Sequence, residues 1–200
     1  MERGTPKRCS WAEGCEDIYV DYHDNEWGVP LHDDTRLFEL LILEGFQAGL
    51  SWITILKKRE NFRRAFEDFD PEKIASYDRK KIDSLLSNSG IIRNRSKIEA
   101  SIQNAKSFIR VKEEFGSFDR YIWRFVGGRT RINSWREWKE IPTTSRESNS
   151  MSMDMKSRGF KYVGPTICYS FMQAAGLVND HEVECFRYEE IIKKFCQNIT

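Results

Sequence analysis

The sequence predicts an all-α fold, for three reasons. Through most of the 200 residues, apolar side chains recur with the three- and four-residue spacing of one helix face, as at Leu37, Leu40 and Leu41. Capping residues and glycines stand where the helices so indicated would begin and end. The strand-like candidates, such as residues 130–132, are short and isolated.

Start and stop signals give each predicted helix its bounds. Asp33 or Asp34 can cap the first helix, and Gly45 can supply its left-handed end. Asp70 precedes Pro71, which is a cap followed by proline at the first helical position. The predicted helices cover about 34–45, 51–69, 71–90 (closed by glycine), 92–115 and a segment that begins at Ser117.

Composition bounds the class of protein. With 32% charged residues and no run of about 20 apolar residues, the chain is not expected to span a membrane. The stretch Met1 to Arg8 is polar and basic, so no export signal is expected, and five cysteines, an odd number, favour reduced thiols or metal ligands over disulfides. We expect a monomer in the cytoplasm or nucleus, associated with the nucleoid if the source is bacterial.

Residues 1–200 are expected to form one globular domain. The alternative is two helical lobes: about 30–125, and a hairpin-containing part at 150–185 that packs with the N-terminus.

The net charge of +1 gives no argument for a polyanionic partner, so any nucleic-acid site must be local. The basic runs that could supply a site are Lys57, Lys58, Arg59, Arg63 and Arg64; Arg93, Arg95 and Lys97; and Lys156, Arg158 and Lys161. The alternative is that these runs form solvated helix faces, as basic runs usually do.

A glycine-bounded turn precedes one strongly apolar helix. Gly159 and Gly164 enclose Lys161, and Pro165 leads into the apolar run 167–175. This pattern resembles a helix-hairpin-helix, in which glycines let the backbone approach DNA and the second helix directs its N-terminal N–H groups at a phosphate. The alternative is a plain connection between two core helices.

His181 and Cys185 are spaced to share one helix face with metal-ligand geometry. A half-buried helix face is the alternative. Further ligands would have to come from the N-terminal region, which offers Cys9, Cys15, His23 and His32. A site of Cys9, His23, His181 and Cys185 would be a closed, structural Cys₂His₂ zinc site with no position left for a water.

Several longer blocks, in order along nearly the whole chain, resemble the 3-methyladenine DNA glycosylase I family. The blocks are Arg8-Cys-Ser-Trp11, Tyr22-His-Asp-Asn-Glu-Trp-Gly-Val-Pro30, Leu43-Glu-Gly-Phe-Gln-Ala-Gly-Leu-Ser-Trp52, Leu56-Lys-Lys-Arg-Glu-Asn61, Gly90-Ile-Ile-Arg93, Arg158-Gly-Phe-Lys-Tyr-Val-Gly164 and Asn179-Asp-His181.

The resemblance implies a helix-hairpin-helix glycosylase fold and an enzyme that removes alkylated bases from double-stranded DNA. It also implies one structural Zn²⁺ per chain, which joins the N- and C-terminal regions through Cys9, His23, His181 and Cys185. The other thiols and His32 are then ordinary residues; the thiols are Cys15, Cys168 and Cys196. Gly159, Lys161 and Gly164 become the expected DNA contacts.

Glu44 is the expected substrate-recognition residue, because the resemblance and the local pattern agree. It interrupts an apolar stripe in the last helical turn, where the helix dipole disfavours a negative charge. By resemblance, Tyr22, Trp52 and Trp11 surround the base. Methylation at ring position 3 makes adenine cationic and a good leaving group, so discrimination matters more than a strong acid: aromatic faces attract the cation and a carboxylate accepts from its amino edge.

The water-activating group is not assigned. Asp180 follows the hairpin at a distance along the chain that would suit a general base. The alternative is that Asn179 or Asp180 caps a helix bearing His181, with Glu182 completing a capping box. No lysine fits a β-lyase nucleophile, so a monofunctional enzyme that leaves an abasic site is expected.

Two positions depart from the family pattern: Phe46 replaces a polar residue and Pro165 a hydroxyl residue. Three rival functions remain open on sequence grounds. They are a non-catalytic zinc-stabilised module that binds alkylated DNA, a metallohydrolase with an open zinc site, and a helical zinc domain with no role on DNA.

Overall fold

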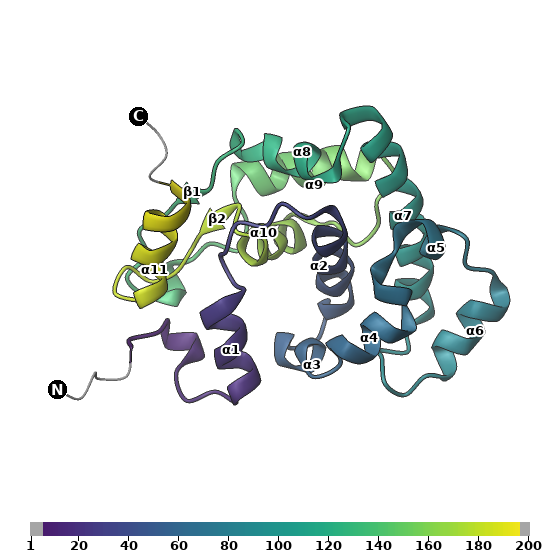
Figure 1. Cartoon of the computed structure of the whole chain (residues 1–200), viewed down its shortest axis with the longest axis horizontal. Coiled ribbons are helices and arrows are strands. Elements are labelled where there is room, and N and C mark those ends of the chain that lie inside the picture. Colours follow the sequence, from purple (N-terminus) through teal and green to yellow (C-terminus); the bar gives the residue numbers. More distant parts are fainter. Residues whose placement is uncertain (1–5, 197–200) are drawn as a thin grey trace.

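The computed structural model describes residues 6–196, and within them the chain is mostly helical (Figure 1). The prediction of a helical protein is confirmed. Most of the stretch Met1 to Arg8 and the side chain of Cys196 lie outside the described residues. The α-helices are α1 (Asp17–Asn25), α2 (Asp34–Gln47), α3 (Trp52–Leu56), α4 (Arg59–Ala65), α5 (Pro71–Ala75), α6 (Arg79–Ser87), α7 (Arg95–Phe115), α8 (Phe118–Trp123), α9 (Arg146–Ser157), α10 (Pro165–Ala174) and α11 (Phe186–Ile191).

Shorter elements connect these helices within residues 6–196. The 3₁₀ turns there are η1 (Ser10–Ala12), η2 (Glu67–Phe69), η3 (Arg124–Val126) and η4 (Trp138–Glu140), and a π-helical turn, η5 (Ile192–Cys196), follows α11. Strands β1 (Arg131–Ile132) and β2 (Val178–Asn179) pair in parallel, with Arg131 opposite Val178. The strand-like candidate at 130–132 is therefore a strand, but it is paired, not isolated.

The predicted N-terminal caps of α2, α5 and α8 are confirmed. Asp33 accepts a hydrogen bond from the Arg36 N–H at 2.8 Å, and Asp70 and Ser117 cap α5 and α8 in the same way. Such side-chain acceptors satisfy N–H groups that have no partner inside the helix.

Three predicted helix extents were wrong. Helix α2 continues past Gly45, which packs against Tyr162 inside the helix, and Gly49 supplies the positive φ beyond its end. The segment 51–69 breaks into α3, α4 and η2; α3 ends before Lys57, and residues 67–69, which form η2, take positive φ angles of 53–57°. The segment 71–90 is likewise two helices, α5 and α6.

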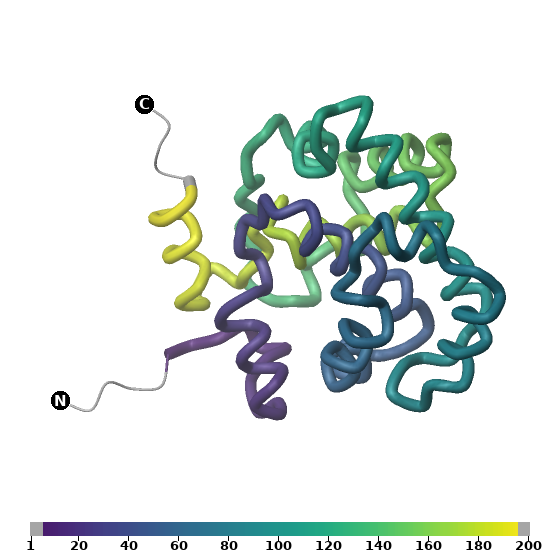
Figure 2. The backbone as a smooth tube through the Cα atoms, turned by 45° about the vertical axis from the view of Figure 1, so that its right-hand side comes forward, coloured from purple at the N-terminus to yellow at the C-terminus, as the bar shows by residue number. Residues whose placement is uncertain are grey.

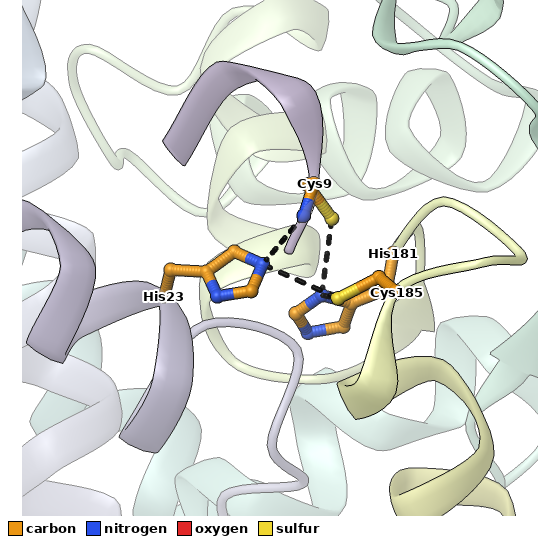
Figure 3. Close-up of side chains that lie close together, drawn as sticks. All are labelled: Cys9, His23, His181 and Cys185. Atoms are coloured by element: carbon orange, nitrogen blue, oxygen red, sulfur yellow. Dashed lines mark hydrogen bonds between the residues drawn. The ribbon is translucent and has the colours of Figure 1, made fainter. Parts of the chain in front are cut away.

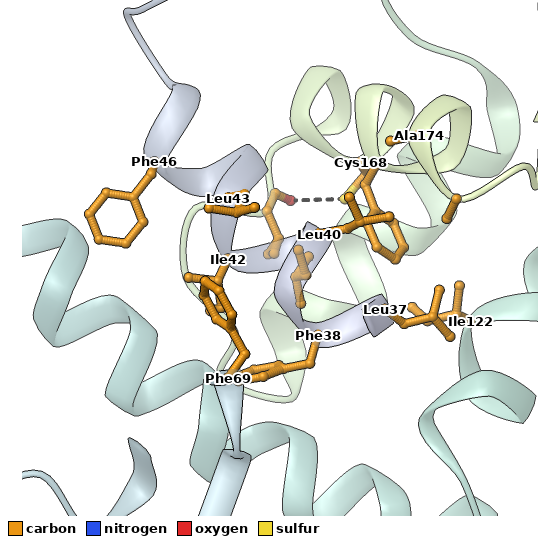
Figure 4. Close-up of a cluster of buried hydrophobic side chains, with 14 of the residues drawn as sticks. Leu37, Phe38, Leu40, Ile42, Leu43, Phe46, Phe69, Ile122, Cys168 and Ala174 are labelled. Carbon is orange, nitrogen blue, oxygen red and sulfur yellow. Dashed lines mark hydrogen bonds between the residues drawn. The ribbon is translucent and has the colours of Figure 1, made fainter. Parts of the chain in front are cut away.

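Helix α2 lies at the centre of the molecule. All ten residues from 37 to 46 are buried, and α2 packs against α3, α7, α8 and α10 (Figure 4). A helix that is apolar on all sides needs neighbours on all sides. The buried hydrophobic side chains form one contiguous cluster around it, and the division of the chain into one domain or two lobes stays a prediction.

The start of α11 lies beside the first described residues of the chain (Figure 2). The N–H of Phe186, at the start of α11, donates to the carbonyl of Lys7 at 2.9 Å. The segment after α1 is tied to the end of α10, since Gly28 donates to the Gln173 carbonyl and Leu31 to that of Ala175. Within residues 6–196, no helix is long and apolar enough to cross a membrane.

Gly176 permits this close approach, and its replacement tests the arrangement. It has φ +70°, and an added Cβ would lie 2.4 Å from the Pro30 nitrogen, so backbone would have to move. We expect Gly176→Ala to lower the free energy of unfolding by at least about 3 kcal/mol in urea titrations. Gly14→Ala is the matched control. Gly14 has φ +69° in open space, so Gly14→Ala should lower the free energy of unfolding by only about 1 kcal/mol. Equal losses of stability in the two variants would contradict the close approach at Gly176.

Candidate functional site

A cavity of about 310 Å³ opens between α1, α2, α3, α10 and the loop after η4. Its walls are mainly aromatic. The lining residues are Trp11, Tyr19, Tyr22, Trp27, Glu44, Gln47, Trp52, Trp138, Ile141, Pro142, Thr143, Thr166, Tyr169, Ser170 and Gln173. All four residues predicted to recognise a base, Glu44, Tyr22, Trp52 and Trp11, are therefore brought together.

Glu44 is the buried acid of this cavity. Its side chain comes from α2, the residue is 4% exposed, and Oε2 has no hydrogen-bond partner within residues 6–196. Burial raises the pKa of Glu44 to about 8, because the charged form is poorly solvated there. The indole Nε1 of Trp52 is also buried without a partner. Glu44 Oε2 and Trp52 Nε1 thus give the cavity wall a buried acceptor and a buried donor that have no partner among the described residues.

Aromatic rings surround that carboxyl. The rings of Tyr22 and Trp52 lie 5.6 Å apart at 52°, and Trp11 meets Trp27 edge-on at 5.0 Å. Burial and the nearby Glu44 raise the pKa of Tyr22, so it stays a neutral phenol with an electron-rich face. The arrangement suits a flat ring that carries positive charge and a hydrogen-bond donor.

Sequence reasoning missed several residues of the cavity wall. Tyr19 and Gln47 are each three residues from a predicted site residue on the same helix, Tyr22 and Glu44, so helical spacing could have found them. Ending the helix at Gly45 removed Gln47 from consideration. The wall contributed by α10 and by the η4 loop, including Trp138, carries no sequence signal that links it to Glu44.

A second buried group lies beside the cavity. Cys9, His23, His181 and Cys185 each direct one donor atom inward, and these atoms all lie within 4.8 Å of one another (Figure 3). Cys9 Sγ lies 3.3 Å from His181 Nδ1, and Cys185 Sγ lies 3.5 Å from His23 Nε2. Tetrahedral zinc, with bonds of about 2.3 Å to sulfur and about 2.0–2.1 Å to nitrogen, requires sulfur–nitrogen separations of about 3.6 Å. The residues present therefore fit a four-coordinate metal.

Neighbouring groups fix the two imidazoles in the tautomers that a metal requires. His23 Nδ1 faces the Asp24 carboxylate at 2.7 Å, and His181 Nε2 faces the Trp27 carbonyl at 2.9 Å. Because both partners only accept, each of these ring nitrogens carries its proton, which leaves the opposite nitrogen unprotonated toward the centre. Hydrogen bonds from Cys9 and the imidazoles lower the pKa of Cys185. Cys15 is outside the group.

The prediction that His181 and Cys185 share a helix face was wrong. No helix spans them: β2 ends at Asn179, and α11 begins only after Cys185. Neither Asn179 nor Asp180 is a helix cap, and Glu182 forms no capping box with Asn179. Its carboxylate instead accepts from Ser10 and from the Trp138 N–H. Asp180 is buried and does not line the cavity.

The predicted hairpin is the connection from α9 to α10. Gly159 ends α9 with φ +88°, and an added Cβ would lie 3.3 Å from Gln103 and Ser107 of α7. Asn104 bonds both the N–H and the carbonyl of Lys161, at 2.7 and 3.0 Å. Gly159 is thus required by its turn and by packing, whereas Gly164, at the N-cap of α10, has open space around it.

Members of each basic run are engaged in internal contacts. Arg59 pairs with Glu39 and Glu26, each at 2.6 Å. Lys97 donates to the carbonyls of residues 46 and 48 at the end of α2, and Arg158 pairs with Glu114 and Asp154. Arg59 and Lys97 are buried, so the usual interpretation of such runs as solvated helix faces does not fit them.

Phe46, the first departure from the family pattern, packs into the core. Its ring meets those of Phe62 and Phe66 at 4.7 and 5.8 Å, and it does not line the cavity. Pro165 stands at the first position of α10, directly before the lining residue Thr166.

Fold and cavity together define a helical protein with an aromatic pocket around a buried acid, and comparisons with known proteins agree. The methyladenine glycosylase family matches residues 11–188. The chain is 48% identical to DNA-3-methyladenine glycosylase 1 of Escherichia coli (strain K12), over 91% of this chain and 97% of that protein. It is 47% identical to DNA-3-methyladenine glycosylase of Haemophilus influenzae, over 89% and 96%.

Solved structures give the same result. A crystal structure of 3-methyladenine DNA glycosylase I matches with TM-score 0.87 and 50% identity, covering 90% of this chain and 98% of that one. A Staphylococcus aureus 3-methyladenine DNA glycosylase I, solved to show 3-methyladenine recognition, matches with TM-score 0.87 and 37% identity, covering 92% and 97%. The chain belongs to the methyladenine glycosylase family.

The burial of Glu44 predicts a pH-dependent loss of stability. Its pKa is about 8 in the folded protein and near 4.5 in the unfolded chain, so folding takes up a proton between these pH values and the free energy of unfolding falls as pH rises. Glu44→Gln removes this term. In urea titrations the variant should be more stable than wild type by about 4 kcal/mol at pH 8 and by less than about 1 kcal/mol at pH 5.

Glu39→Gln is the matched control on the same helix. Glu39 is buried but paired with Arg59 and Arg63, so its replacement leaves buried positive charge unpaired and should destabilise. A Glu44→Gln protein that is no more stable than wild type at pH 8 would contradict the burial of an unpaired acid.

Proposed function

We propose that this chain removes 3-methyladenine from double-stranded DNA, hydrolyses its N-glycosidic bond and leaves an abasic site. The observation that carries the proposal is the unpartnered Glu44 carboxyl inside an aromatic cavity, in a chain of the methyladenine glycosylase family. A damaged base would enter the cavity by leaving the helix stack, at a cost of a few kcal/mol.

The empty pocket favours the neutral form of Glu44, and a cationic base reverses that preference. A positive charge within a few ångströms lowers the pKa of a carboxyl. Glu44 would therefore ionise as 3-methyladenine enters, and its oxygen would accept from the amino edge of the base. Neutral adenine lacks the charge, so it gains less from Glu44 and from the faces of Tyr22 and Trp52.

The chain's own residues support a reaction without a lysine nucleophile. No lysine is among the residues that line the cavity in the described chain, which fits a monofunctional enzyme with water as nucleophile. The methylated base is already a good leaving group. The pocket needs chiefly to bind, orient and discriminate.

We propose that the α9–α10 hairpin contacts the DNA backbone through Lys161 and Gly164. Two residues of the first turns of α10, Thr166 and Ser170, line the cavity, so the start of α10 lies beside it. The open surroundings of Gly164 allow a close approach of DNA. Pro165 removes one N–H from that helix start. Gly159 supports the turn from behind.

We propose that Cys9, His23, His181 and Cys185 hold one structural Zn²⁺. The inward-facing donors and the fixed tautomers support it. A four-ligand zinc holds distant segments together and supplies no activated water. None of the four residues lines the cavity, which counts against the metallohydrolase alternative.

Release of free base separates the enzyme from a binding module. We expect wild-type protein to release 3-methyladenine from methylated duplex DNA, and Glu44→Gln to release it at least about 100-fold more slowly, because a buried charge interaction is lost. The assay is chromatography of the freed base under single-turnover conditions. Phe46→Leu, which alters the core outside the cavity, should stay within a few-fold of wild type. Binding of methylated DNA without base release would favour the non-catalytic module.

Metal content and thermal unfolding test the zinc proposal. Purified protein should carry one zinc ion per chain, and Cys185→Ala should lose it and unfold at a temperature at least about 10 °C lower. Cys15→Ala, outside the donor group, should retain the metal and the unfolding temperature. Equal zinc content in the two variants would show that the ion is bound elsewhere.

A further inference from the structure

Asp180 is buried to 1% exposure and accepts four hydrogen bonds. Its Oδ1 accepts from Asn133 Nδ2 at 2.6 Å and from Trp135 Nε1 at 2.8 Å. Its Oδ2 accepts from Tyr169 Oη at 2.7 Å and from Gln173 Nε2 at 2.8 Å. The two oxygens therefore serve different parts of the molecule, since Oδ1 holds the loop after β1 and Oδ2 holds α10.

The two partners of Oδ2 belong to the cavity wall. Tyr169 and Gln173 both line the cavity, whereas Asp180 lies behind them. With all four bonds made and no cavity contact, Asp180 is not placed to take a proton from water in the cavity. Its influence on a ligand must pass through those two side chains.

A carboxylate can only accept, and this fixes the orientation of the Gln173 amide. The amino group of Gln173 must face Asp180, so its carbonyl oxygen Oε1 is turned to the other side. Within residues 6–196, no hydrogen bond reaches that oxygen. The cavity wall therefore has a free hydrogen-bond acceptor at Gln173. The same amide turned over would have nearly the same shape but would present its amino group, a donor, instead.

We propose that Asp180 is a positioning residue that sets the hydrogen-bond polarity of the cavity wall. By holding the Gln173 amino group, it presents the carbonyl of Gln173 to a ligand that donates hydrogen bonds. The exocyclic amino group of an adenine-type base has that chemistry. This inference rests on the proposed function for the class of ligand.

Asp180→Asn reverses the direction of the hydrogen bond to the Gln173 amide with little change of shape. Trp135 can only donate, so the amide oxygen of the new side chain faces Trp135 and its amino group faces Gln173. The Gln173 amide then turns over and offers its own amino group to the cavity. Affinity for free 3-methyladenine should fall about tenfold, the effect of one hydrogen bond replaced by two opposed donors.

A double-mutant cycle separates positioning from general damage. Affinities for free 3-methyladenine are measured by calorimetry for wild type, Asp180→Asn, Gln173→Ala and the double variant, at equal zinc content. If Asp180 acts through Gln173, Asp180→Asn has no further effect in the Gln173→Ala background. Trp135→Phe removes a bond to Oδ1 only, and it should lower stability while keeping affinity within about twofold.

An equal loss of affinity from Asp180→Asn in both backgrounds would overturn the inference, as would full affinity in a folded Asp180→Asn protein. A failure of the proposed function would give a different result, because wild-type protein would then neither bind 3-methyladenine nor release it from DNA.

If Asp180→Asn does not fold, wild-type protein still supplies a test. The side-chain amide of Gln173 should show slow hydrogen exchange by NMR, and its carbonyl carbon should shift on addition of 3-methyladenine. An amide that exchanges as fast as an exposed glutamine would overturn the inference.

Discussion

The burial of α2 is the constraint on which the rest of the structure depends. Ten consecutive buried residues require neighbours on every face, and α3, α7, α8 and α10 provide them. Each fully buried Leu, Ile or Phe contributes about 1.5–3 kcal/mol. That gain offsets the unfavourable burial of Glu44, which, unlike the buried and paired Glu39, has no ion-pair partner among the described residues. Glu44 stays in the interior because exposing it to water would also expose the apolar residues before and after it on α2.

The same helix joins the pocket to the rest of the protein. Lys97, from α7, covers the carbonyls at the end of α2, and Gln47, one turn after Glu44, reaches the cavity. On the other side of the cavity, Trp11 packs edge-on against His23 of the donor group at 5.1 Å. One tryptophan therefore contacts both the cavity and the four-residue donor group, and the two share a wall.

Local chemistry made part of this structure predictable from sequence. Caps such as Asp33 and Asp70 depend on neighbours a few residues away, and those predictions were correct. Helix lengths failed where tertiary packing decided them, as at Gly45, which is held inside α2 beside Tyr162. His181 and Cys185 were assigned to a helix because their spacing allows it. Between the β1–β2 pair and the tie to residue 7, that segment instead forms a turn, in which the Cys185 N–H donates to the Glu182 carbonyl at 2.8 Å.

The residues of the site likewise divide into those that the sequence could identify and those that depend on tertiary contacts. Glu44 could be identified because an acid on an apolar stripe needs an explanation, and the resemblance named Tyr22, Trp52 and Trp11. Gln173 could not be found in that way, and Asp180 was singled out only as a candidate general base or helix cap. The hydrogen bond between them joins α10 to the segment after β2, and nothing in either segment alone indicates it.

The separation of the four donors along the chain also has a consequence for assembly. Cys9 meets His181 across 172 positions, and His23 meets Cys185 across 162. Trp11 and Tyr22 are therefore made well before His181 and Cys185, which close the donor group behind them. A nascent chain that has not yet reached Cys185 cannot support Trp11 from the side of the donor group. In this protein the order of translation separates the making of the first cavity residues from the moment at which their surroundings are complete.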